Sequence, residues 1–249
     1  YLKRFGISYC CMLGNENYDY FEDFNKVNFK CTAELRAPNP DFDVDIVRFS
    51  NRHDVIVMVD FVEELIPIIA QACPVELMDA EKEIKCNSSY ISENKFVESV
   101  NMIFAEMVIR NNQYKDANMD ISVLDKYDER CYVIFGVKKF IEQLTDDARD
   151  KFFTLLVKAE PIYKIHFVLC DSVSQIKKYE YDAWYKQHIF GADGVWVGEG
   201  IADQFAFKIN KVTSEMYEDV EAHFGYLIYR NRPAFVKLLS SEGKGSDRL

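Results

Sequence analysis

The four histidines are the first side chains to consider for acid–base or metal chemistry. His53 sits in a polar turn, His166 lies within an apolar run, and His188 and His223 fall near the ends of expected helices. None has a nucleophile, a carboxylate or a second ligand at the spacing of a catalytic triad or a zinc site. The sequence therefore predicts no catalytic residue and no metal ligand among them.

Two other segments combine residues that often do chemistry. Asp79 to Glu83 follows an expected strand and carries carboxylates, but the sequence offers no second cluster to pair with them. We interpret it as a charged strand-to-helix loop. Gly191 to Gly200 contains four glycines around Val195 to Val197, without the GxGxxG pattern that opens the helix of a dinucleotide site. A structural turn is the favoured interpretation, and a ligand cradle is the alternative.

The charge balance narrows the range of partners. Asp plus Glu outnumber Lys plus Arg by 41 to 30, which gives a net charge of -11 without a basic stripe. We therefore expect no nucleic-acid partner and no attraction to an anionic membrane surface.

The seven cysteines form an odd set without CxxC spacing, which indicates reduced core thiols in a cytosolic setting. No run approaches the ~20 apolar residues of a membrane span, so we expect a soluble chain, which can still be a fragment of a membrane protein.

The elements that must position these residues follow from short apolar runs that alternate with amphipathic stretches. The runs predict strands buried on both faces of a largely parallel sheet, and hence an α/β fold. They are Ile7 to Met12, Val55 to Val59, Val75 to Met78, Tyr132 to Phe135 and Ile165 to Leu169. Helices are expected over residues 63–72, 95–111, 172–188 and 214–223, and from the cap Thr145 to Pro161. A late hairpin is expected from Tyr226 to Tyr229 and Ala234 to Leu238.

From about Val55 to Ile209, the order of these elements resembles an FtsK/SpoIIIE-type P-loop ATPase module. The version it resembles is the last ATPase-like domain of EssC-type coupling proteins of type VII secretion. The resemblance implies a RecA-like fold, with a mostly parallel sheet flanked by helices. It rests on the strands over residues 55–59, 75–79, 131–135 and 165–170, the helices after them, and the turn at Gly194 to Gly198 followed by Ala202 to Phe205.

The resemblance also implies a domain organisation. Residues 1–36 resemble the end of a preceding ATPase domain or form an N-terminal extension, residues 37–240 form the RecA-like domain, and residues 241–249 form a flexible tail. The turn-rich segment Ala37 to Asp41 marks the first boundary.

Two departures from the family pattern bear on nucleotide chemistry. Where the resemblance places the phosphate loop GxxxxGK[ST], the sequence has Val59, Asp60 and Phe61, followed by Glu63 and Glu64. Where it places the metal-side acid, at the end of the expected strand 132–135, the sequence has Gly136. Without a cradle for phosphate and a carboxylate for the metal, the electrostatic contributions that dominate phosphoryl transfer are absent. The sequence thus predicts a degenerate ATPase, with ATP and Mg²⁺ implied only through the resemblance.

The resemblance implies a role in recognising secreted substrate proteins and regulating neighbouring ATPase domains of the same polypeptide. It further implies a cytoplasmic domain tethered to the cell membrane, and allows a homo-hexamer in the full assembly. Two alternatives stay open. One is an active ATP-binding motor whose mobile phosphate loop is absent from this sequence between Asp60 and Phe61, and the other is a DNA-translocase module.

Overall fold

The computed structural model describes residues 44–49, 52–87, 89–158, 161–186, 190 and 194–238. The strand expected over Ile7 to Met12, the segment 1–36 and the tail 241–249 lie outside these residues. The described part is built on one sheet of eight strands in the order β3-β2-β4-β5-β1-β6-β7-β8. The strands are β1 (Val44–Phe49), β2 (Val75–Asp79), β3 (Ser89–Tyr90), β4 (Arg130–Phe135), β5 (Ile165–Ser172), β6 (Gly194–Val197), β7 (Phe224–Tyr229) and β8 (Arg232–Lys237).

The first six strands of that order are parallel, and the last two pairings are antiparallel. β4 and β5 are buried over nearly their whole length, as the continuous apolar runs in their sequences predict. The strands predicted over Val75 to Met78, Tyr132 to Phe135 and Ile165 to Leu169 are confirmed as β2, β4 and β5, and the late hairpin is confirmed as β7 and β8. The RecA-like α/β fold class is confirmed with them.

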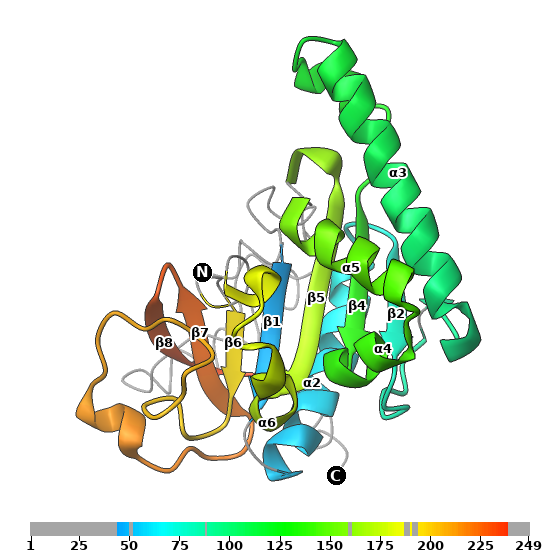
Figure 1. The fold of residues 1–249 in the computed structure, drawn as a ribbon. Helices are drawn as coiled ribbons and strands as arrows, with labels where there is room; N and C mark the ends of the chain where they lie inside the picture. The colour runs from blue at the N-terminus through cyan, green and yellow to red at the C-terminus, as the bar shows by residue number, and fades with distance from the viewer. Residues whose placement is uncertain are drawn as a thin grey trace.

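Helices cover both faces of this sheet (Figure 1). α2 (Arg52–Ile69) packs on one face, where its apolar side chains meet the inward residues of β2, β4 and β5. α3 (Phe96–Asp116), α4 (Val137–Gln143), α5 (Asp146–Lys158) and α6 (Val173–Ile176) lie on the other face. The helices predicted over residues 95–111 and after Thr145 are confirmed as α3 and α5.

Aromatic rings join the helices of the second face to each other and to the sheet. The Phe140 ring of α4 lies 5.0 Å from Phe96 of α3 and 5.1 Å from Phe152 of α5, between ring centroids. Phe152 in turn lies 6.3 Å from Phe167 of β5. Because these rings are buried and in contact, they hold α3, α4 and α5 against one another and against β5.

The strand predicted over Val55 to Val59 is wrong, because these residues belong to α2. The β-branched run resembles a buried strand when taken alone. In the structure the buried residues Met58, Val62, Leu65 and Ile69 follow helical spacing. The strand that precedes α2 is β1, which the sequence analysis did not predict.

Two of the expected helices differ from the structure: one is reduced to a short turn, and the other is divided into short helical pieces. Within 214–223, only a 3₁₀ turn over Ser214–Tyr217 forms, and His223 has the left-handed φ of 64°. A left-handed residue cannot continue a helix. The helix expected over 172–188 is divided into α6, a 3₁₀ turn over Lys177–Tyr179 and a further helical stretch that includes residues 183–186.

Candidate functional site

The carboxyl edge of the parallel strands is the first candidate site. β1 and β5 are neighbours in the sheet, but α2 follows β1 on one face and α6 follows β5 on the other. Open α/β sheets bind ligands outside the carboxyl ends of strands at such a switch point. The strand β5 ends there with Asp171 and Ser172, which lie opposite Arg48 and Phe49 of β1.

Asp171 is the most strongly perturbed carboxylate at this edge. Its side chain is only 4% exposed, and burial raises its pKa to about 7. Backbone N–H groups of Lys138 and Ser172 each donate to the carboxylate at 2.7 Å, which opposes that rise. Asp171 therefore ties the start of α4 to the end of β5, and both oxygens are used in doing so.

Gly136 stands at the end of β4, as predicted, and has the left-handed φ of 76°. A Cβ atom built on Gly136 would lie 2.6 Å from Cγ of Glu81, and Glu81 pairs with Lys139 at 3.1 Å. The space for a side chain is thus already occupied by the loop after β2. In this arrangement an acidic side chain at position 136 has no room unless Glu81 moves.

The loop after β2 is ordered by Asp79. Its carboxylate accepts backbone N–H groups from Glu81 at 3.0 Å, Lys82 at 2.8 Å and Ile84 at 2.8 Å. Burial raises the pKa of Asp79, and these hydrogen bonds act in the opposite direction. The geometry agrees with the interpretation of Asp79 to Glu83 as a charged loop. Within the described residues, no group of three or more His, Cys, Asp or Glu side chains is placed to hold a metal ion.

The position predicted for the phosphate loop needs a correction. Val59, Asp60 and Phe61 lie in the interior of α2, because the strand expected before them is part of this helix. The strand-to-helix junction at the switch point runs from Phe49, the end of β1, to Arg52, the start of α2. Ser50 and Asn51, between them, include no glycine and no lysine. A phosphate loop absent between Asp60 and Phe61 would have to interrupt a continuous helix.

The glycine-bearing segment forms a turn after β6. Gly198 and Gly200 have φ values of 80° and 84°, which glycine adopts without strain. Trp196, 2% exposed, donates its indole N–H to the carbonyl of Glu199 at 2.8 Å. The described part of this segment therefore fits the structural-turn interpretation.

The histidines whose side chains the structure describes, His166 and His223, each lie beside an acidic side chain of another element or loop. His166 is buried at the amino end of β5 and contacts the carboxylate of Glu129. His223 lies 3.6 Å from Asp60, between Nδ1 and Oδ2, and so connects α2 to the start of β7.

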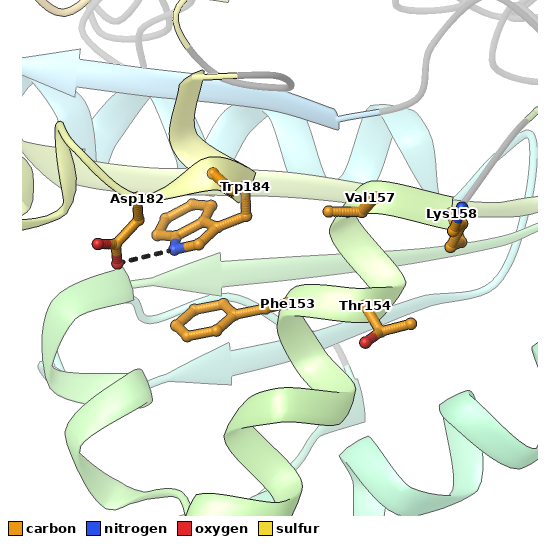
Figure 2. A pocket seen from close by; sticks show the side chains of 7 residues that line it. Phe153, Thr154, Val157, Lys158, Asp182 and Trp184 are labelled. Atoms are coloured by element: carbon orange, nitrogen blue, oxygen red, sulfur yellow. Dashed lines mark hydrogen bonds between the residues drawn. The ribbon is translucent and has the colours of Figure 1, made fainter.

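A second candidate site is a hollow of about 400 Å³ between α5 and the segment after α6 (Figure 2). The rings of Phe153 and Trp184 stack in its wall, with centroids 5.1 Å apart and planes 10° apart. Val157 adds apolar surface, and the indole N–H of Trp184 donates to Asp182 at 3.3 Å. Thr154, Lys158 and Ala183 complete the lining.

The sequence analysis missed both Asp171 and this hollow. It recognised the strand that carries Asp171 but assigned no role to the residue where the strand ends. A carboxylate at the carboxyl end of a buried parallel strand was the available signal. Phe153 was placed in the α5 helix, but its pairing with Trp184 joins residues that are far apart in sequence.

No protein-family profile matches the sequence, and no curated protein matches it either. Among solved structures, ATPases 2 and 3 of EccC from Thermomonospora curvata, in complex with a signal sequence peptide, superpose with a TM-score of 0.60 at 13% identity over 84% of this chain. ATPases 2 and 3 of EssC from Geobacillus thermodenitrificans give 0.58 at 12% identity over 80%. The pCW3 conjugation coupling protein TcpA, with ATPγS, gives 0.58 at 10% identity over 82%.

These similarities show that the chain has the fold of FtsK/SpoIIIE-type ATPase modules, as the resemblance predicts. The chain spans 39% of the EccC chain, 37% of the EssC chain and 62% of the TcpA chain. Within the described residues, no helix combines the length and apolarity needed to cross a membrane.

Proposed function

We propose that this chain is a protein-binding module of a secretion coupling ATPase, and that it recognises a segment of a substrate protein without hydrolysing ATP. The observation that carries this proposal is the hollow lined by Phe153, Val157 and Trp184. Its volume of about 400 Å³ suits a bulky apolar side chain. Side chains that enter a pocket and become fully desolvated there carry much of the binding energy of protein interfaces.

The carboxyl edge of the sheet supports the proposal that the chain does not hydrolyse ATP. Phosphoryl transfer needs a phosphate cradle with its lysine, and a carboxylate for Mg²⁺. Gly136 stands where the family's metal-side acid is expected, and Glu81 fills the adjoining space. Asp171 and Asp79 already accept backbone N–H groups. We therefore assign this edge a structural role and leave cofactors such as ATP and Mg²⁺ to the neighbouring modules.

The comparisons suggest the kind of partner. The EccC module pair of similar fold was solved with a signal sequence peptide. We assign a peptide of this class, from a secreted protein, to the hollow of this chain. Binding of the peptide in the hollow would then regulate neighbouring ATPase domains of a longer polypeptide. In this proposal the chain is a cytoplasmic domain that is held near the cell membrane.

Tryptophan fluorescence offers a direct test of peptide binding. The chain has two tryptophans, and Trp196→Phe leaves Trp184 in the hollow as the single reporter. Amphipathic helical peptides with Leu or Phe on one face serve as the probe. We expect a saturable change in Trp184 emission at micromolar peptide. If none of the apolar peptides changes the emission of Trp184, although circular dichroism shows that the chain is folded, the proposal is contradicted.

A matched pair of variants locates the site. Ala183 lines the hollow and is exposed, and Ala70 is exposed directly after α2, which packs on the opposite face of the sheet. Ala183→Arg should weaken peptide binding at least about tenfold, because a charged side chain at the mouth must be desolvated. Ala70→Arg should leave the affinity unchanged. Equal effects of the two variants would place the peptide elsewhere.

Calorimetry separates this proposal from the active-motor alternative. We expect no saturable heat when MgATP is titrated into the full chain at millimolar concentration. Measurable ATP binding, lost on changing residues at the junction between β1 and α2, would favour the alternative and refute the non-hydrolysing role.

A further inference from the structure

α3 is the longest helix in the described part of the chain, and one of its sides faces solvent. It has 21 residues, so it spans about 32 Å. Figure 1 shows it along one side of the molecule, with one end extending past the strands. From its N-cap residue to its last residue, exposed positions recur at alternating spacings of three and four. They are Lys95, Glu98, Met102, Ala105, Ile109, Asn112 and Asp116. We call them the outer stripe, and their spacing is typical of a helix that packs along another helix.

The centre of the outer stripe is apolar. Met102 is 60% exposed and Ile109 is 52% exposed. Ala105, between them, has only a methyl group, so a second helix can approach the backbone closely. The core contacts of α3 use the opposite side of the helix, where Ile103 and Met107 are buried. The outer stripe therefore keeps apolar surface in water that a partner can cover.

The two ends of α3 carry charges in an order that makes the helix complementary to itself. Lys95 and Glu98 lie at the amino end, and Lys115 and Asp116 lie at the carboxyl end, all four exposed. None of the four forms an ion pair with another side chain of the described residues. Lys95 and Asp116 are 10 and 11 residues from Ala105, on opposite sides of it. A second α3 running in the reverse direction thus meets each charge with the opposite one.

We propose that two copies of this chain associate through the outer stripe, with their α3 helices antiparallel around a two-fold axis beside Ala105. Met102 of each copy then lies next to Ile109 of the other, and Lys95 lies next to Asp116 of the other. A parallel pair would bring like charges together at both ends. The partial charges of the helix ends also favour the antiparallel arrangement. A shallow crossing angle of about 20° keeps both ends of the helices within reach of each other.

The association is weak, because the interface is small. A single pair of helices buries less than the roughly 1,200 Å² at which stable complexes begin, and each copy carries a net charge of -11. We expect a dissociation constant on the order of 100 µM at physiological salt, where charges more than about 8 Å apart are largely screened. The association does not depend on peptide binding, since the lining of the hollow comes from α5 and the segment after α6.

Sedimentation velocity of the full chain, at concentrations up to about 1 mM, tests the association. We expect a reversible monomer–dimer equilibrium. Met102→Asp should raise the dissociation constant at least about tenfold, because it places a carboxylate in the apolar centre. The control is Tyr217→Asp, since Tyr217 is 65% exposed in the turn before β7 and not on α3. A chain that stays monomeric throughout would overturn the proposal, and so would equal effects of the two variants.

Reversal of the end charges tests the orientation. Lys95→Glu and Asp116→Lys should each raise the dissociation constant at least about fivefold, because each turns two attractions of the dimer into repulsions. Both changes suit the helix dipole, so fraying of α3 cannot account for the loss. The double variant restores the attraction in an antiparallel pair and should return to within about twofold of the unmodified chain. A double variant as weak as the single ones refutes the antiparallel pairing.

Discussion

At the residue scale, two positions at the carboxyl edge of the sheet make contacts that hold neighbouring elements together. One is a left-handed glycine, and the other is a buried aspartate that accepts two backbone hydrogen bonds. Gly136 accommodates the loop after β2, and Asp171 holds the start of α4. Both positions are therefore used for structure, and each can be tested by a single substitution.

Gly136→Ala should lower the free energy of unfolding by about 1–2 kcal/mol, because an L-residue is strained at a φ of 76°. The new methyl group also displaces Glu81, which loses its pairing with Lys139, and this exposed pair adds at most about 1 kcal/mol. Urea denaturation measures the change. Gly200→Ala is the matched control, since its φ is 84° but the nearest atom lies 3.9 Å from the added Cβ. A smaller loss at position 136 than at position 200 would contradict the crowding by Glu81.

Asp171 predicts a pH dependence of stability. Burial raises the pKa of its carboxyl group to about 7 from an ordinary 3.8, so between these pH values the folded chain holds a proton that the unfolded chain has released. Stability from this group is therefore highest at low pH and falls as pH rises from about 4 to about 7. Between pH 5 and pH 8 the unmodified chain should lose up to a few kcal/mol relative to Asp171→Asn, in urea titrations at both pH values. Parallel pH profiles for the two proteins would refute this.

At the element scale, the aromatic contacts between α3, α4 and α5 decide which substitutions in these helices destabilise the chain most. Phe140 is fully buried between Phe96 and Phe152. Phe104, which the apolar stripe of α3 predicts as a core residue, is only partly buried, because α3 turns that side toward solvent. The apolar stripes of α3 and α5 also predict core positions for Met107, Val108, Phe152 and Leu156. Met107, Phe152 and Leu156 are buried, which confirms the prediction for them, whereas Val108 is half-buried.

Phe140→Ala should therefore destabilise the chain by about 3–5 kcal/mol, the usual loss for a buried aromatic side chain. Phe104→Ala should cost clearly less than that, because part of its surface is already in water. Thermal and urea unfolding of the two variants, side by side, make the comparison. An equal loss in both would mean that α3 is rotated relative to the sheet.

At the scale of the whole molecule, the net charge of -11 governs encounters with polyanions. We expect no specific binding to duplex DNA at physiological salt, measured by anisotropy of a labelled duplex, because counterion release requires clustered Lys and Arg side chains. Submicromolar affinity with a steep salt dependence would instead favour the DNA-translocase alternative.

The sequence alone determined the α/β class, the strands β2, β4 and β5, and the helices α3 and α5, because continuous apolar runs and helical stripes are local patterns. It also led to Gly136 at the end of β4, which depends only on where a strand stops. Tertiary structure alone decided that Val55 to Val59 belongs to α2, since strand and helix are both compatible with a short β-branched run until one face is buried. It likewise brought Phe153 against Trp184 and, among the described strands, placed β8 at the edge of the sheet. Such contacts join distant parts of the chain, and no local pattern encodes them.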